Sequence, residues 1–148
     1  MMISTKGRYA LRVLCELSTA YGDGYASLRD IAHSQNISVK YLESIMSCLF
    51  RAGIVDSRRG RLGGYRLARR ARDISVFSVF DAVEDSVSAV ACLDHDGILC
   101  GREEHCAGYP LWVSLQQVID SYLKSVTLED IINGSYSHAM EVFRESLC

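Results

Sequence analysis

Three cysteines share one short segment of the chain, with the spacing Cys92-x7-Cys100-x5-Cys106 and no helical apolar periodicity around them. Three thiolates and one further ligand can hold either zinc or an iron–sulfur cluster. In a cytosolic protein, such a group is more typical of metal binding or redox chemistry than of structural disulfides. The gaps are wider than the C-x2-C pairs of zinc ribbons. They favour an iron–sulfur cluster (2Fe–2S or 4Fe–4S) over zinc, a thiol redox switch or no function.

The charges of the chain are divided unequally between its two halves. Residues 1–72 hold thirteen of the sixteen lysines and arginines but five of the eighteen acids, which gives a net charge of +8. Residues 73–148 have a net charge of −10. Eight arginines lie between Arg51 and Arg72, with Asp56 as the one acid among them. This division predicts nucleic-acid binding by the N-terminal half, although a charge run can also be a solvated surface.

The N-terminal half has the pattern of a helix–turn–helix followed by a hairpin. Ser4 or Thr5 can cap a first helix, Ser27 begins a capping-box pattern, and Ser38 can cap a third helix. That third helix ends at Gly53 and has apolar residues at helical spacing, namely Leu42, Ile45, Met46 and Leu49. Two short strands at 54–57 and 65–68 then flank the arginine- and glycine-rich segment 58–64. We therefore expect a mostly α fold with a small β-wing, and a winged helix–turn–helix DNA-binding domain over residues 1–85.

The second half is expected to contain a sensor loop at 86–109 and a dimerisation helix with a C-terminal tail at 110–148. Pro110 suits a helix N-terminus. The helix after it has an apolar stripe about four turns long, formed by Leu111, Trp112, Leu115, Val118, Ile119, Tyr122, Leu123 and Val126. This spacing favours a homodimer over a helix packed on its own domain. No apolar run approaches the ~18–20 residues that span a bilayer, and no secretory signal is recognised, so we expect a cytoplasmic protein without a membrane partner.

The expected partner is double-stranded DNA with a palindromic operator whose half-sites lie about one helical turn (~34 Å) apart. The candidate contacts are Thr5 and Lys6 on the first helix, Ser38, Lys40, Tyr41 and Glu43 on the third, and Arg59, Gly60 and Arg61 on the wing. Glu43 could accept a hydrogen bond from cytosine N4, or it could be an ordinary surface glutamate. The wing arginines are expected at the minor groove, and the first helix at a phosphate.

Several motifs together resemble one family, the winged-helix regulators that include IscR, NsrR, RirA and CymR. The motifs are 4–10, Tyr41-Leu42-Glu43, Arg59-Gly60 with Gly63-Gly64-Tyr65, Leu111-Trp112, and 127–130. The resemblance spans about residues 2–132 and is to the IscR or RirA branch. It implies a homodimer whose long C-terminal helices cross near the cysteine loops. It also implies that iron–sulfur status controls promoter binding in response to iron, cluster supply, redox state or nitric oxide.

The fourth ligand of such a cluster is open in this sequence. Tyr109 stands where IscR has a histidine, and the gap between Cys92 and Cys100 is wider than in IscR and similar to that of RirA. NsrR-like proteins can take a partner carboxylate from position 8, where this chain has Arg8. The candidates are a small exogenous ligand and the side chains of His105, Tyr109, Asp94, His95 and Asp96.

Two other functions are alternatives to a cluster-sensing regulator. The first is a cysteine-metabolism repressor of the CymR type that acts through a protein partner, with the cysteines binding zinc or acting as a thiol switch. The cysteine trio argues against it, because the CymR-like pattern lacks one. The second is an enzyme or electron carrier. No nucleophile–base constellation or phosphate loop is present, and the glycines at 60–64 lead into a strand rather than a helix, so no enzymatic activity is expected.

Overall fold

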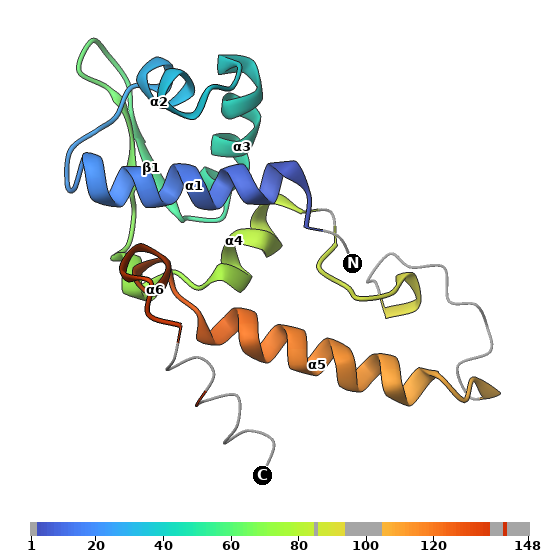
Figure 1. Ribbon diagram of the computed structural model, residues 1–148. Helices are drawn as coiled ribbons and strands as arrows, with labels where there is room; N and C mark the ends of the chain where they lie inside the picture. The colour runs from blue at the N-terminus through green and yellow to red at the C-terminus, as the bar shows by residue number, and fades with distance from the viewer. Residues whose placement is uncertain (1–2, 85, 94–104, 137–140, 142–148) are drawn as a thin grey trace.

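The computed structural model describes residues 3–84, 86–93, 105–136 and 141, and forms a winged helix with a long projecting helix (Figure 1). The elements in chain order are α1 (Thr5–Ala20), α2 (Leu28–Gln35), α3 (Val39–Arg51), β1 (Val55–Arg58), β2 (Gly64–Leu67), the short 3-10 turn η1 (Ala71–Asp73), α4 (Val76–Val83), a second 3-10 turn η2 (Ala91–Leu93), α5 (Tyr109–Ser125) and α6 (Leu128–Asn133). The fold class predicted from the sequence is confirmed. Each strand lies one residue away from its predicted position.

Side-chain caps fix where the helices begin. Ser4 accepts a hydrogen bond from the Gly7 N–H, and Ser38 accepts one from the Tyr41 N–H, so α1 and α3 start where the sequence predicts. Ser27 also caps α2, where its hydroxyl accepts from the Asp30 N–H (3.2 Å) and donates to the Asp30 carboxylate (2.6 Å). A full capping box, in which the N-cap backbone N–H also donates to the carboxylate, forms at Thr127, where α6 begins.

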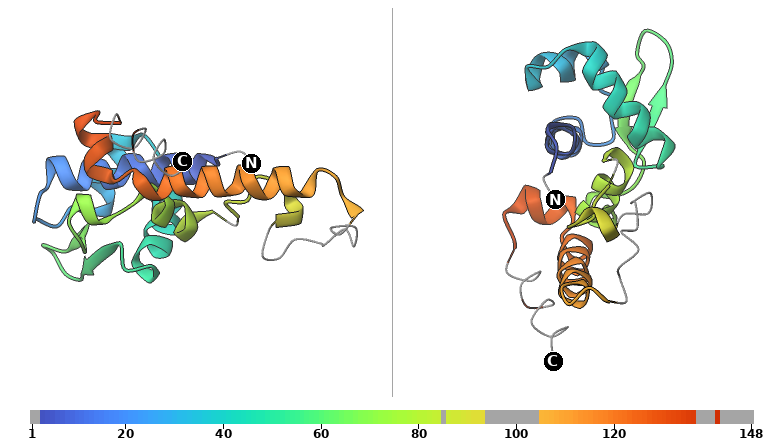
Figure 2. Two further views of the ribbon diagram at one scale, coloured as in Figure 1. Left: turned by 90° about the horizontal axis from the view of Figure 1, so that it is seen from below. Right: turned by 90° about the vertical axis from the view of Figure 1, so that its right-hand side faces the viewer.

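Helix α1 lies at the centre of the molecule, with α2 and α3 on one side and α4 and α6 on the other (Figure 2). One face of α1 and the apolar stripe of α3 are fully buried in a common core. Leu128 at the start of α6 is fully buried in the same core, although it is separated from α1 by more than a hundred residues. The N-terminal fold is therefore closed by a residue from the far part of the chain.

The wing is attached to the helix–turn–helix by backbone pairing. Strands β1 and β2 are antiparallel, and Tyr65 of β2 also exchanges two 2.9 Å hydrogen bonds with Ala26, just before α2. Gly64 has φ of 149°, and a Cβ at this position would collide with the Ala26 carbonyl oxygen. Only glycine allows the hairpin to come so close to the segment before α2.

Helix α5 extends beyond the winged helix (Figures 1 and 2), and large apolar side chains in its first half are exposed. Near its C-terminal end, Leu123 and Val126 pack with Val76 and Phe80 from α4. Nearer its N-terminus, Leu111 is 60% exposed and Leu115 is 41% exposed. The apolar stripe predicted from the sequence is thus only partly buried within one chain. Among the described residues, no helix is both long enough and apolar enough to cross a membrane.

Candidate nucleic-acid interface

The N-terminal part of α3 presents most of the predicted base contacts to solvent. Ser38, Lys40 and Glu43 are exposed, while Tyr41 is half-buried. The Tyr41 ring packs edge-on against Tyr9 of α1, with centroids 6.0 Å apart. The opposite face of α3 is fixed in the core, so this exposed face is held in one orientation. A helix presented in this way can enter a major groove.

Glu43 faces the wing across a hollow. On α3 the hollow is lined by Glu43, Ser47 and Phe50, and on the wing by Ser57, Arg58, Arg59, Gly64 and Tyr65. No ion pair within 4.0 Å joins Glu43 to a cation in the described part of the chain. The carboxylate is therefore available to accept a hydrogen bond from a base amine. Phe50, which is 50% exposed, was not singled out by the sequence reasoning.

The wing ends in a tight turn that presents a cation beside an apolar side chain. The Gly63 N–H donates to the Gly60 carbonyl (3.0 Å), so Arg61 and Leu62 occupy the two corners of the turn. Leu62 is 82% exposed, and the sequence reasoning missed it. The signal was present, since Leu62 is the one large apolar residue between Arg58 and Gly64. Apolar side chains at such positions can contact the minor groove.

The arginines of the wing have two different environments. Arg58 and Arg66 lie over the ring of Tyr25, at 5.9 and 4.9 Å, and Arg66 is also 3.7 Å from the Asp56 carboxylate. The charges of Arg58 and Arg66 are therefore used in contacts within the protein. Arg59 and Arg61 are exposed, and neither forms an ion pair with another described residue. The two arginines predicted to contact DNA are thus the two whose charges are free.

The N-terminal turn of α1 carries Thr5 and Lys6 beside α3. Thr5 is exposed and its hydroxyl accepts a hydrogen bond from Arg8 (3.1 Å). The Lys6 ammonium lies 3.4 Å from the Cys48 sulfur, and Arg51 lies at the same distance from that sulfur. Arg8 and Arg51 were not predicted as contacts, but they add to the positive charge at this end of α1.

Cys48 lies beside the apolar stripe of α3 and packs against the core on one side. It is half-buried. Burial raises the pKa of its thiol, but hydrogen bonds from Arg51 and Lys6, together with their charges, outweigh burial and hold the pKa below its usual value. Cys15 also packs against the core, but there burial raises the pKa of the thiol.

The residues of the predicted cluster site are only partly described by the structure. Cys92 is half-buried in η2, and Cys106 is exposed just before α5. His105 is exposed, and Tyr109 is the first residue of α5. Cys100, Asp94, His95 and Asp96 lie outside the described residues. Within the described part of the chain, no three metal-ligating side chains come together. Cys92 and Cys106 are both free thiols, which is the donor chemistry that an iron–sulfur cluster takes.

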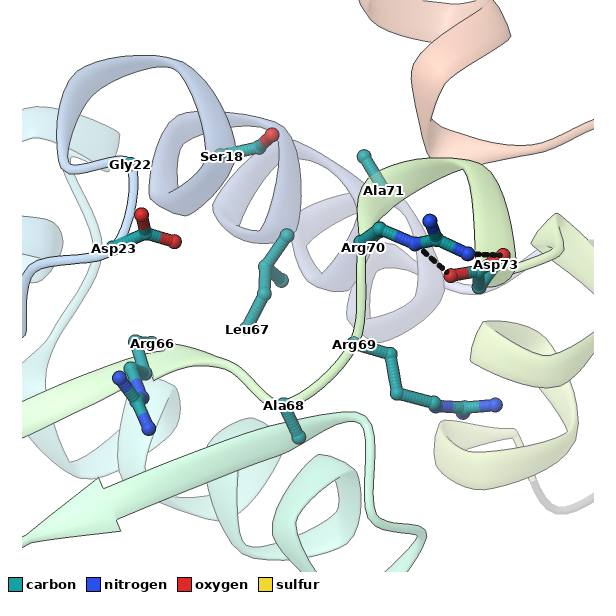
Figure 3. Close-up of a pocket in the computed structure, with 10 residues that line it drawn as sticks. All are labelled: Ser18, Gly22, Asp23, Arg66, Leu67, Ala68, Arg69, Arg70, Ala71 and Asp73. Atoms are coloured by element: carbon teal, nitrogen blue, oxygen red, sulfur yellow. Dashed lines mark hydrogen bonds and ion pairs between the residues drawn. The ribbon is translucent and has the colours of Figure 1, made fainter.

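A separate open hollow lies between the end of α1 and the segment that joins the wing to α4 (Figure 3). Its lining carries charges of both signs, and its residues are Ser18, Gly22, Asp23, Arg66–Ala71 and Asp73. Arg70 donates two hydrogen bonds to Asp73 (2.6 and 3.3 Å), which raise the pKa of Arg70 and lower that of Asp73. The pair closes the turn η1. The hollow contains none of the predicted DNA contacts.

Comparison with known proteins gives one family. The family model described as "Rrf2: Iron-dependent Transcriptional regulator" matches residues 3–134. The chain is 38% identical to the HTH-type transcriptional regulator IscR of Yersinia enterocolitica over 134 residues, which cover 90% of this chain and 80% of that protein. It is 36% identical to the IscR of Pectobacterium carotovorum, with the same coverage.

Solved structures of the same kind share the fold. CymR, the global cysteine regulator of B. subtilis, has a TM-score of 0.71 and 36% identity, with 91% of this chain and 98% of that chain covered. The IscR of T. potens also has a TM-score of 0.71, at 32% identity and 91% and 88% coverage. One of these two similar structures is thus a CymR and the other is an IscR.

The environment of Cys48 predicts unusual reactivity. Because the thiolate is the nucleophile, iodoacetamide should alkylate Cys48 faster than Cys15 near pH 7, where the lower pKa leaves more thiolate. Mass spectrometry of tryptic peptides separates the two sites. The Lys6→Met variant removes one cation beside Cys48. It should slow the alkylation of Cys48 and leave the alkylation rate of Cys15 unchanged. Equal or faster alkylation of Cys15 would contradict the electrostatic account.

Proposed function

This chain belongs to the Rrf2 family of transcriptional regulators, and we propose that it binds a palindromic DNA operator as a homodimer under the control of its cysteine segment. The observation that carries the proposal is the juxtaposition, on one surface, of the exposed face of α3 with the free Arg59 and Arg61 of the wing. A polar helix face suits a major groove, and a cationic hairpin suits the adjacent minor groove.

The contacts divide into those that position the protein and those that read bases. Thr5, Lys6, Arg59 and Arg61 supply hydrogen-bond donors or charge, and most of their energy comes from phosphates and is independent of sequence. Ser38, Lys40, Tyr41 and Glu43 lie where the N-terminal part of a recognition helix meets base edges. Glu43 is the discriminating residue in this proposal, because a carboxylate near DNA gains from a cytosine amine and loses near a phosphate.

We assign dimerisation to the first half of α5. Leu111 and Leu115 are large apolar side chains exposed on one helix, and neighbouring stripe residues such as Trp112 and Val118 are only half-buried. A helix that leaves such a stripe uncovered is typical of a partner interface. Two copies paired along α5 would present two copies of α3 to successive turns of one DNA duplex, which matches a palindromic operator.

In the sensing part of the proposal, Cys92, Cys100 and Cys106 hold an iron–sulfur cluster, with His105 or Tyr109 as candidate fourth ligands. Such a cluster supplies a group whose presence and charge depend on iron, oxygen or nitric oxide. The thiols of Cys92 and Cys106 support this assignment because neither is paired in a disulfide. Three thiolates and a weak fourth ligand would favour a labile cluster, which suits a sensor.

A second candidate follows from the similarity to CymR, which is as strong in TM-score as the similarity to IscR. In this alternative the chain regulates cysteine metabolism through a protein partner, and the cysteines bind zinc or act as a thiol switch. The two candidates share the DNA-binding surface and differ in what the cysteine segment holds.

Replacing Arg59 and Arg61 together by Ala should weaken binding to many sequences and flatten its salt dependence. Each lost phosphate contact lowers the slope of log K against log salt by about 0.9, and a dimer loses four such contacts, so the change should approach about 3.6. Fluorescence anisotropy on a duplex selected from a random 30-bp library by the wild-type protein measures it. The paired control Arg69→Ala with Arg72→Ala removes the same charge outside the surface. An unchanged salt slope in the Arg59→Ala, Arg61→Ala variant would contradict the assignment of the wing to the DNA interface.

Leu115→Glu should dissociate the dimer, because it places an unpaired carboxylate in an apolar interface. We expect the dimer dissociation constant to rise by at least about tenfold, measured by sedimentation equilibrium over a range of concentrations. Gln117→Glu, at an exposed position of α5 outside the stripe, is the matched control. A wild-type protein that stays monomeric, or a Leu115→Glu variant that dimerises equally well, contradicts the assignment.

Anaerobically purified protein should show the visible absorbance of an iron–sulfur cluster, with stoichiometric iron and sulfide. Replacing any one of Cys92, Cys100 and Cys106 by Ser should abolish it, while Cys15→Ser should not. Colourless protein with stoichiometric zinc would favour the second candidate.

A further inference from the structure

The carboxylate of Glu84 lies on the first turn of α1, eighty residues away in sequence. Its Oε1 accepts hydrogen bonds from the Ser4 backbone N–H (3.1 Å) and from the Ser4 hydroxyl (2.9 Å). Ser4 is the N-cap of α1, so Glu84 binds the residue that begins the helix. No side-chain cation in the described residues forms an ion pair with Glu84. Its charge is therefore stabilised by the Ser4 N–H, the Ser4 hydroxyl and the helix dipole of α1.

The close approach depends on Gly7. This residue is buried, and a Cβ there would collide with Glu84 Oε1 and lie 3.2 Å from a ring carbon of Phe80. Any other residue at this position would displace the carboxylate or the helix. The glycine in the first turn of α1 thus serves to admit the end of α4.

The same end of α1 is the one that carries Thr5 and Lys6. A carboxylate here stabilises the helix but occupies the positive end of its dipole, where a DNA phosphate would also be favoured. Its negative charge would also repel a DNA phosphate bound at this end of α1, and salt would screen that repulsion. Glu84 therefore opposes DNA binding at this contact for as long as it stays on Ser4.

Glu84 is connected to the segment that carries Cys92. It is the C-cap residue of α4, and residues 86–93 follow shortly after it. That segment is held on α5 by Gln116, whose side chain accepts from the Ala89 N–H (2.6 Å) and donates to the Val87 carbonyl (3.3 Å). Asp120, one turn further along α5, accepts from the same amide at 2.7 Å and orients it. Between Cys92 and α1, the chain is thus held by two sets of hydrogen bonds: those of Gln116 to the 86–93 segment, and those of Ser4 to Glu84.

We propose that Glu84 is a positioning residue that lowers the affinity of the α1 end for DNA, and that release of the 86–93 segment from Gln116 withdraws its carboxylate and raises that affinity. The inference rests on the proposed DNA binding. To the proposed contacts it adds Glu84, a residue outside the contact surface. It also adds a route by which the cysteine segment and α5 act on that surface.

The test is the Glu84→Gln variant. The glutamine oxygen can still accept both hydrogen bonds from Ser4, so the fold is kept while the charge is removed; the melting temperature checks this. On the duplex selected by the wild-type protein, the dissociation constant should fall by about fivefold at low salt, and the gain should shrink as salt screens the charge. The matched control is Glu129→Gln, which removes an exposed charge from α6 and should leave the dissociation constant unchanged.

The link to the cysteine segment is tested by Gln116→Met, which keeps the side-chain length but removes the hydrogen bonds to the segment. It should raise DNA affinity in the wild-type background and have no further effect in Glu84→Gln protein. Additive effects of the two changes would overturn the link. Unchanged or weaker binding by Glu84→Gln at every salt concentration would overturn the inference as a whole. A wild-type protein that selects no duplex would instead refute the proposed function.

Discussion

The pairing between Ala26 and Tyr65 is the contact on which the geometry of the surface depends. A two-stranded hairpin alone is marginally stable in water, and its direction would be set only by its two ends. The two hydrogen bonds from Ala26 make the segment before α2 a third partner in this small sheet. They fix the wing beside the helix–turn–helix, and the missing side chain of Gly64 makes the approach possible. The free arginines at the wing and the exposed face of α3 belong to one surface for this reason.

Local signals in the sequence were sufficient for most of the fold. Ser4, Ser27 and Ser38 cap helices where the sequence predicted, because a cap involves only the next three residues. The change from helical to strand period located the wing to within one residue. Burial of one face of α3 followed from its apolar stripe, and the exposed opposite face followed from that burial.

The parts that escaped the sequence reasoning are contacts between distant residues. Nothing in the order of residues places Lys6 against Cys48, so the contact between this cation and the half-buried sulfur could not be predicted. The bond from Ser4 to Glu84 joins two unremarkable polar residues whose nearness depends on how α4 packs on α1. Side-chain choices of this kind are decided by tertiary packing.

The burial of Leu128 also affects how the protein is made. Every residue assigned to the DNA surface has left the ribosome before α5 is synthesised, yet the core beneath that surface lacks one fully buried side chain until α6 appears. Hydrogen bonds between Val76 and Val126, and between Leu128 and Ile74, tie the late segment to the early one. A nascent or prematurely terminated chain would carry all the contact residues on an unfinished core. Loss of Leu128 would therefore disturb the core beneath the proposed DNA surface without removing any of the contact residues.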